Sequence, residues 1–293
     1  MYVKIPLSIE KEAFPADMPD NSTGLIEDRF VYLVEDKFSL HLDSDDSAVV
    51  TGTVHGTVHI NDEVYVIDYT GKTLLTRIRQ LESMSGSGTE HPDSCTDAQV
   101  AITLAIAPSE IDKFCVVTNI KPWVSRDVNQ AVENPYLLGI LYGEKFRDDD
   151  LYFSRLVFAL AHAFFITPIS MSKTPVNNGD GTATFKAETQ ISFSLLSNPS
   201  FPGQNTLAVF TDWIELGKWQ NAPKDENGKV QTMILRFPDV VHLVADPGIN
   251  GCVVNAFGKS SLFIPTSLID NITSLEGYRK ENGESPKTDN QGH

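Results

Sequence analysis

The chain has 293 residues, 41% of them hydrophobic and 21% charged, which is the composition of a globular protein and excludes wholesale disorder. This length predicts one to three domains. The formal net charge is −16, and because nucleic acids are bound mainly through Lys and Arg, such a balance excludes RNA and DNA as expected partners.

The acidic charge is concentrated in the first part of the chain. Residues 1–125 hold 9 Lys and Arg against 20 Asp and Glu, a net charge of −11, whereas residues 126–293 hold 14 against 19, a net charge of −5. A basic protein is therefore the partner that electrostatics favours. Charge kept only for solubility is the plainer alternative.

The first 25 residues are rich in Pro, Asp and Ser and are predicted to form an irregular arm. The opening MYVKIPLSIEKEAF has no apolar stretch of the kind that directs secretion. Three cysteines, Cys95, Cys115 and Cys252, are odd in number and widely spaced, which fits neither a disulfide framework nor a CxxC metal pair. We therefore expect a cytoplasmic protein with reduced thiols.

Residues 26–121 are predicted to form a small closed antiparallel six-stranded β-barrel. Short runs rich in Val, Ile, Thr and Tyr end at Gly, Asn or Asp, as strands do. Gly52 and Gly56 lie inside one run and suggest the bulges or bends that a small barrel needs. Closing the sheet removes its exposed edges. The six runs are FVYLVEDKFSLHL, AVVTGTVHGTVHI, EVYVIDYTGK, TLLTRIRQL, Gln99–Ile106 and Phe114–Ile120.

The barrel segment resembles the second domain of elongation factor Tu and related translational GTPases. The stretches FVYLVEDKFSLHL and AVVTGTVHGTVHINDEVYVID carry the resemblance, and QVAITLAI with KFCVVTN is similar to the closing strands of those domains. The resemblance implies a translation-type barrel, and the chain departs from those GTPases because it has no GTP-binding domain. The sequence contains no GxxxxGK[ST] loop to cradle phosphates, so we expect neither GTP binding nor any cofactor.

A linker, residues 122–133, is predicted to lead into a mixed α/β (α+β) layered domain, residues 134–276. Asn134-Pro135 is typical of a helix start, with Asn as N-cap and Pro in the first turn. The apolar run from Leu151 to Ile169 is interrupted by charged residues and a proline, and we interpret it as a buried helix followed by a strand, not a membrane span.

Further along, strands and helices alternate, as in a layered α/β unit. Strands are predicted at ATFKAETQISFSLL, TLAVF, GCVVNAFG and SSLFIPT, and helices at DWIELGKW, FPDVVHLV and SLIDNI. Residues 277–293 lack apolar side chains after Tyr278 and are predicted to form a disordered tail.

This second half resembles the N-terminal domain of the SseB family, named for enhanced serine sensitivity. The resemblance rests on ENPYL, FFITPI, LAVFTDW, LRFPDVVHLV and GCVVNAFGKSSLFIPTSLI, about residues 130–275. Ala256 stands where the family usually has proline. The resemblance implies a bacterial protein and no established chemistry. The family positions matched are Phe210, Thr211, Trp219, Asn255 and Phe257.

Candidate chemistry is sparse along the chain. His55 and His59 lie four apart on one strand with His41 on its neighbour, and two or three histidines on a sheet face are most often only solvated. The acidic run Asp43–Asp46 lacks the glycine and glutamate of a calcium loop. No GxSxG elbow occurs.

Buried groups account for the other candidates. Cys252 lies in an apolar strand and is expected to be an inert buried thiol. His162 and His242 have apolar neighbours in sequence and are expected to lie in the core. Residues distant in sequence could still meet in space, so an enzyme with a site at the junction of the two halves stays an alternative.

The candidate partner-binding residues are Asp212, Trp213, Asn255 and Phe257. They follow short apolar strands, where turns present side chains outward on a rigid scaffold. Trp is also over-represented among residues that anchor protein partners. Core packing of Phe210, Trp213 and Trp219 is the alternative.

Together these observations predict a multi-domain β and α/β protein without catalytic, cofactor-binding or metal-binding residues that can be named. We expect a non-enzymatic, SseB-like cytoplasmic binding or adaptor protein, with protein partners and no nucleic acid or membrane partner. A translation-associated accessory factor that docks through its barrel is the second interpretation, since fold resemblance alone does not establish function.

Overall fold

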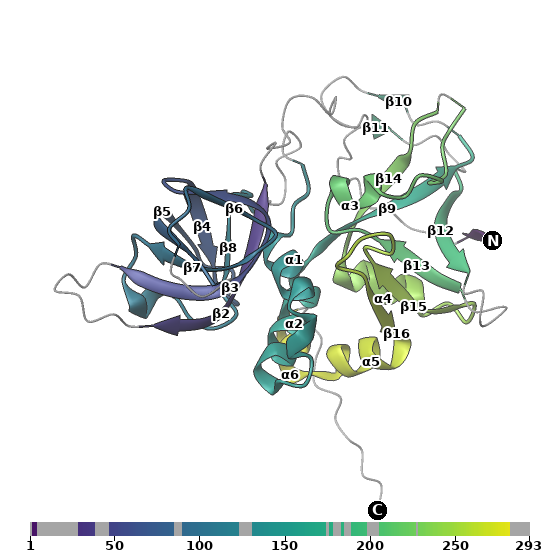
Figure 1. Ribbon diagram of the computed structural model, residues 1–293. Helices are drawn as coiled ribbons and strands as arrows, with labels where there is room; N and C mark the ends of the chain where they lie inside the picture. Colours follow the sequence, from purple (N-terminus) through teal and green to yellow (C-terminus); the bar gives the residue numbers. More distant parts are fainter. Residues whose placement is uncertain are drawn as a thin grey trace, which may run out of the picture.

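The computed structural model describes residues 2–4, 29–38, 47–84, 90–122, 131–173, 176–177, 183–184, 189–197, 205–226 and 228–281. Figure 1 shows two units, a barrel and a larger α/β unit, with helices α1 and α2 between them. Most of the expected arm and linker, together with His41, Asp43–Asp46 and the tail beyond residue 281, lies outside the described residues.

The first unit is a closed antiparallel barrel, as the sequence predicts. Its strands follow the order β2-β8-β4-β5-β7-β3, and β3 pairs again with β2 to close the ring. A short strand, β6, extends β3 on one side. The strands are β2, Phe30–Phe38; β3, Ala48–His59; β4, Glu63–Ile67; β5, Thr73–Ser83; β6, Ser94–Thr96; β7, Gln99–Leu104; and β8, Val116–Thr118, with a 3-10 turn at Pro108–Glu110.

Two glycines of β3 have different roles in this barrel. Gly56 has φ +101° and lies where the strand bends. Gly52 pairs regularly with Val34, so it is not the bulge that the sequence suggested; the register shift lies in β2, between Val34 and Asp36. A Cβ on Gly52 would come within 2.9 Å of the Tyr32 ring, whose hydroxyl donates to the Val50 carbonyl at 2.9 Å. The missing side chain makes room for a tyrosine inside the barrel.

The second unit is built on a mixed sheet of order β14-β9-β12-β13-β15-β16. Only the pair β13–β15 is parallel, and the other pairs on this path are antiparallel. The strands are β9, Phe164–Met171; β12, Ile191–Ser197; β13, Asn205–Val209; β14, Gln231–Arg236; β15, Ile249–Val254; and β16, Leu262–Pro265, with a separate small pair, β10, Val176–Asn177, and β11, Ala183–Thr184.

Helices cover both faces of this sheet. Helices α4 and α5 pack on one face, and α3 lies on the other over a smaller cluster around Phe210 and Leu216. A layered mixed α/β unit is therefore confirmed. The helices are α1, Pro135–Tyr142; α2, Asp150–His162; α3, Trp213–Gly217; α4, Phe237–Val244; α5, Thr266–Ser274; and α6, Glu276–Glu281, with a 3-10 turn at Glu144–Phe146.

Local signals explain where the central helices begin. Asn134 precedes Pro135 as expected, but its side chain does not cap α1; instead its amide bridges Phe164 and Thr211 of the α/β unit. Asp149 caps α2 by accepting from the amide of Leu151 at 2.9 Å. The apolar run after Asp149 is thus a helix and a strand, and none of the described helices is long and apolar enough to cross a bilayer.

Part of the barrel's outer surface belongs to the hydrophobic core of the α/β unit. The outward faces of β2 and β8 place Val31, Leu33 and Val116 against α1, and these residues belong to the same cluster as the core of the α/β unit. Gly139 of α1 lies so close that a Cβ would come within 2.5 Å of Val116. Ion pairs at the edge of this contact join Lys145 to Glu35 at 2.7 Å and Lys113 to Asp149 at 2.8 Å.

Both ends of the described chain differ from the expected arm and tail. Residues Tyr2–Lys4 form β1, which pairs with β12 of the α/β unit, with Val3 opposite Phe193. Helix α6 includes residues 277–281 of the expected tail, and buried Tyr278 packs edge-on against Phe237 at 6.0 Å between ring centroids. An irregular arm and a disordered tail are therefore wrong for these segments.

Candidate binding site at the junction of the two units

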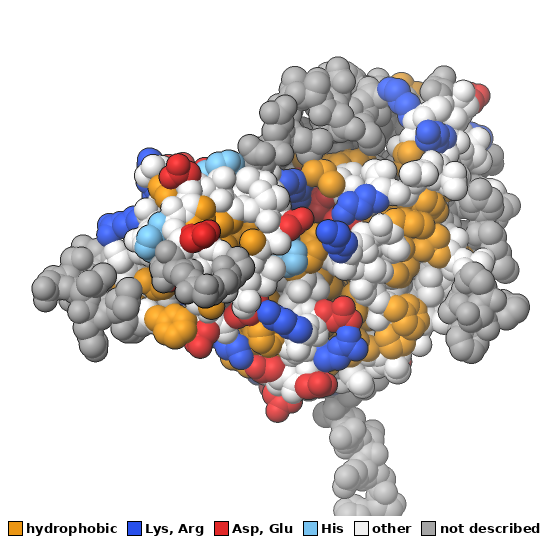
Figure 2. Space-filling view, in the orientation of Figure 1, with side chains coloured by type: hydrophobic (Ala, Val, Ile, Leu, Met, Phe, Trp, Pro, Cys, Tyr) orange, Lys and Arg blue, Asp and Glu red, His pale blue; other side chains and the backbone are white. Residues whose placement is uncertain are grey.

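A pocket of about 360 Å³ lies where the barrel meets the α/β unit. Charged side chains and a histidine gather around this junction on the face shown in Figure 2. One wall comes from the start of β2 and the bend of β3, the floor from α1, and the other wall from α3 and the turn after β15. The lining includes Arg29, Phe30, His55, Asp97, Leu138, Tyr142, Asp212, Ile214, Glu215, Lys218, Phe257, Gly258 and Lys259.

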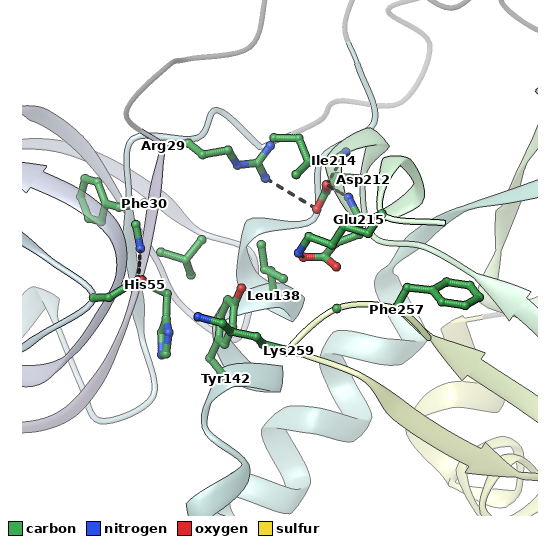
Figure 3. Close-up of a pocket in the computed structure, with 15 residues that line it drawn as sticks. Arg29, Phe30, His55, Leu138, Tyr142, Asp212, Ile214, Glu215, Phe257 and Lys259 are labelled. Atoms are coloured by element: carbon green, nitrogen blue, oxygen red, sulfur yellow. Dashed lines mark hydrogen bonds and ion pairs between the residues drawn. The ribbon is translucent and has the colours of Figure 1, made fainter. Parts of the chain in front are cut away.

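Arg29 connects three distant parts of the chain at one end of this pocket. Its guanidinium donates two hydrogen bonds of 3.1 Å to the Glu133 carboxylate and lies 3.6 Å from Asp212, the contact drawn in Figure 3. Burial raises the pKa of Glu133 from 4.5 to about 7; Arg29 lowers it in part, and Asp212 adds to the rise. Glu133 is therefore a carboxyl group that titrates near neutral pH.

A buried hydrogen-bond network holds the α/β wall in place. Asp212 caps α3 by accepting from the amides of Ile214 and Glu215, each at 2.9 Å. Its other oxygen accepts from the Thr211 hydroxyl at 2.9 Å, and that hydroxyl accepts from the Asn255 amide at 3.0 Å. Asn255 has φ +52°, a left-handed conformation that Asn tolerates better than most residues. This network fixes α3 against the turn after β15.

Glu215 and Lys218 form an ion pair on the same wall, with 2.6 Å between Nζ and Oε1. The other carboxylate oxygen, Oε2, is buried and has no hydrogen-bond donor in the described structure. It lies against Gly258, where a Cβ would approach to 2.0 Å. Glycine at this position therefore lets the turn after β15 pack closely on α3.

The barrel wall carries an aromatic stack. The rings of His55 and Tyr142 lie parallel, with centroids 3.9 Å apart and an interplanar angle of 9°. Burial is the main cause that lowers the pKa of His55, with Lys259 lowering it further and Asp97 opposing, so His55 is neutral at pH 7. Burial raises the pKa of Tyr142 to about 12, so its hydroxyl remains protonated.

Lys259 reaches across the pocket from the opposite wall. Figure 3 shows its side chain extending from the turn after β15 toward Tyr142 and His55. Arg29 and Lys218 are both held in ion pairs, whereas Lys259 has no hydrogen-bond or ion-pair partner among the described residues. Lys259 is thus the cation of this pocket that is free to meet a ligand.

The structure separates the four residues proposed from sequence. Asp212 is 1% exposed and Asn255 is fully buried, so the expectation that they face outward is wrong: both are committed to the network that holds α3. Trp213 is half-buried against the Phe210 cluster. Phe257 is 43% exposed, stacks on Trp219 at 5.1 Å, and points away from the pocket in Figure 3.

The other sequence candidates are spread over the molecule. No three His, Cys, Asp or Glu side chains of the described residues group closely enough to hold a metal ion. Cys252 is buried as expected, and burial raises its thiol pKa to about 12. His162 and His242 are exposed near the ends of α2 and α4, so the expectation that they lie in the core is wrong: amphipathic helices turn part of their surface to solvent.

Sequence reasoning missed the pairing of Arg29 with Glu133 and the position of Lys259. The Arg29–Glu133 pair joins residues 104 positions apart, and no local sequence pattern indicates such a contact. The position of Lys259 could have been found, because this lysine follows a strand in a Gly-containing turn, and such turns present side chains outward.

No protein-family model and no curated protein matches the chain. Among solved structures it is similar in part to GDP-bound aIF5B from Aeropyrum pernix, with 14% identity over 33% of this chain and 17% of that one and a TM-score of 0.27. It is also similar to apo translation elongation factor SelB from Methanococcus maripaludis, with 14% identity over 62% of this chain and 43% of that one and a TM-score of 0.27. The chain thus spans less than half the length of either structure, and the resemblance to the SseB family stands on the quoted residues alone.

Proposed function

We propose that this chain is a non-catalytic binding protein, an adaptor that receives a segment of a partner protein in the pocket between the barrel and the α/β unit. The observation that carries the proposal is a pocket of about 360 Å³ whose walls come from both units. Ligand sites form preferentially at such junctions. Apolar Leu138 and Ile214 line it together with Lys259, which has no ion-pair partner among the described residues.

The side chains of the pocket favour binding over catalysis. A catalytic acid or base must be free to exchange a proton with substrate. Here the Asp212 carboxylate caps α3, Glu215 pairs with Lys218, and Asp97 accepts from the amide of Gly56 at 2.9 Å. His55 is neutral and no carboxylate of the described residues accepts a hydrogen bond from it, which differs from the usual catalytic histidine.

The experiment fills the pocket and measures partner capture. Ile214→Arg places a long side chain into the pocket from a half-buried position outside the main clusters, so the fold is expected to remain intact. The tagged full chain should capture a specific protein from the native host, and Ile214→Arg should lose at least nine-tenths of it at an unchanged melting temperature.

Leu75→Ser is the matched control, because Leu75 is 57% exposed on the barrel and does not line the pocket. It should retain the partner if the pocket is the binding site. The translation-associated alternative uses the barrel instead, and its free surface lies away from β2 and β8, which α1 covers. Loss of capture with Leu75→Ser and not with Ile214→Arg would favour that alternative and refute the pocket.

A further inference from the structure

We propose that the group recognised in the junction pocket is a monoanionic carboxylate, bound by Lys259, Tyr142 and His55. This inference rests on the proposed binding role and adds the chemistry of the ligand. Its basis is a set of polar groups on opposite walls of one pocket that have no hydrogen-bond partner among the described residues.

Three hydrogen-bond donors are available there. Lys259 supplies an ammonium group without an ion-pair partner among the described residues. Tyr142 supplies a hydroxyl that burial keeps protonated, and the neutral imidazole of His55 supplies one N–H. Neither ring makes a hydrogen bond within the described part of the chain. A ligand that accepts hydrogen bonds and carries negative charge satisfies all three.

The remaining charges of the pocket limit how negative that ligand can be. Asp212 and Glu215 are paired with Arg29 and Lys218, yet both still help to raise the pKa of Tyr142 as negative charges do, so they oppose excess negative charge beside its hydroxyl. Asp97 lines the barrel wall and opposes the lowering of the His55 pKa, and its carboxylate accepts from the amide of Gly56 without an ion-pair partner among the described residues. With Lys259 as the one cation without an ion-pair partner and Asp97 as a nearby negative charge, the pocket suits a ligand with a single negative charge better than a doubly charged phosphate.

The size and lining of the pocket agree with a carboxylate on an apolar stem. Val31, Leu138 and Ile214 supply apolar surface beside the donors. The rings of His55 and Tyr142 are stacked with their centroids 3.9 Å apart. The stack offers a flat surface against which the apolar stem of a carboxylate can pack. An acidic side chain or the chain end of a partner both offer this chemistry.

The test titrates the full chain with three fluorinated probes observed by ¹⁹F NMR: 4-fluorophenylacetate, its neutral amide, and 4-fluorophenyl phosphate. The carboxylate should bind at least about tenfold more tightly than the amide, as expected for a charge-assisted hydrogen bond. Lys259→Gln should weaken the carboxylate about tenfold and leave the amide unchanged. Tyr142→Phe, which keeps the ring stack, should weaken it about threefold to tenfold.

Lys224→Gln is the control, because Lys224 is an exposed lysine of the same unit that does not line the pocket. It should change the carboxylate affinity less than twofold. Equal affinity for amide and carboxylate, unchanged binding to Lys259→Gln, or no binding of any probe would each overturn the inference. Tighter binding of the phosphate would overturn the monoanionic class.

Two peptides then separate the sources of the carboxylate. A partner-derived peptide ending in a free carboxylate is compared with the same peptide amidated at its end; a loss on amidation assigns a chain end, and no loss assigns an acidic side chain. The proposed function has a separate outcome. If the probes behave as expected but Ile214→Arg still captures the partner, the carboxylate site stands and the adaptor role falls; the reverse result retains the pocket and rejects the carboxylate.

Discussion

Glu133 is unusual because the pKa of its largely buried carboxyl group is raised although the group is paired with Arg29. The pairing does not offset the cost of burial, and the pKa of Glu133 is raised to about 7. Desolvation disfavours the charged form more than one guanidinium at 3.1 Å favours it. The protonated form can still accept a hydrogen bond from Arg29, which leaves Asp212 as the counter-ion of that arginine at 3.6 Å.

We expect this residue to make stability fall as pH rises through neutrality. The folded pKa of Glu133, about 7, is above the ordinary 4.5, so its favourable contribution is complete below 4.5 and lost as pH passes 7. The difference corresponds to about 3 kcal/mol. Urea unfolding at pH 5 to 8.5 should show Glu133→Gln gaining about 2 kcal/mol relative to the wild type over this range.

Glu144→Gln provides the comparison, since Glu144 pairs with Arg147 at an exposed position near the same junction. Its difference from the wild type should stay constant from pH 5 to 8.5. A constant difference for Glu133→Gln as well would show that Glu133 does not titrate in this range.

At the scale of elements, the starts of α1 to α4 were readable from sequence, whereas α6 and the surface on which each helix packs were not. Pro135 indicated the start of α1 and Asp212 caps α3, because first-turn prolines and caps act within a few residues; Asn134 does not cap α1. The contact of α1 with the barrel depends instead on Gly139, Val31 and Val116, whose sequence distances carry no periodic signal. Two of the four proposed partner-binding residues were misplaced for the same reason: strand-end turns can fold inward when Asn255 and Thr211 satisfy each other.

The contact of α1 with the barrel yields a test at this scale. A Cβ at position 139 would lie 2.5 Å from Val116 and 3.1 Å from Val31, both β-branched residues held in strands. Gly139→Val should therefore destabilise the protein by about 1–3 kcal/mol through overpacking. Differential scanning calorimetry should detect the change as a lower melting temperature.

Gly217→Val is the matched variant, because Gly217 ends α3 with no atom within 4 Å of an added Cβ. This variant makes the same Gly-to-Val change in a helix, but at a position where the added side chain meets no neighbouring atom. Equal destabilisation by both substitutions would attribute the effect to helix propensity and not to the contact between α1 and the barrel.

At the scale of the whole molecule, the sequence predicted a barrel and a separate α/β domain, and the structure adds an apolar interface between them. The barrel has its own interior cluster around Tyr32, Ile78 and Leu81. Its outer face at β2 and β8, however, belongs to the core of the α/β unit. A barrel-like texture in the sequence could not reveal this, because outward apolar residues on a strand resemble those of any sheet buried on both faces.

The linker predicted at residues 122–133 implies that residues 1–125 and 126–276 fold independently, and the structure allows a test of this. The barrel fragment, residues 1–125, should fold but expose Val31, Leu33 and Val116, and exposed apolar patches drive association. Sedimentation velocity at about 50 µM should show self-association of this fragment. Replacing all three residues with Thr should return it to a monomer with its circular dichroism unchanged.

A monomeric wild-type fragment at that concentration would contradict the expected role of this surface. For the full chain, the apolar interface predicts a single cooperative unfolding transition, since neither unit can open without exposing apolar surface of the other. Two resolved calorimetric transitions would argue that the interface contributes little.

The close approach of Gly139 to Val116 and Val31 also constrains how the sequence can evolve. A side chain at this position has room only if the barrel residues opposite it shrink, so positions 139, 116 and 31 constrain one another across the contact. In related sequences we therefore expect these three positions to change together, with larger residues on α1 accompanied by smaller ones on β2 or β8. The barrel and the α/β unit would then have been passed on as a matched pair, and a barrel transplanted from another protein would not fit beside α1 without a compensating change.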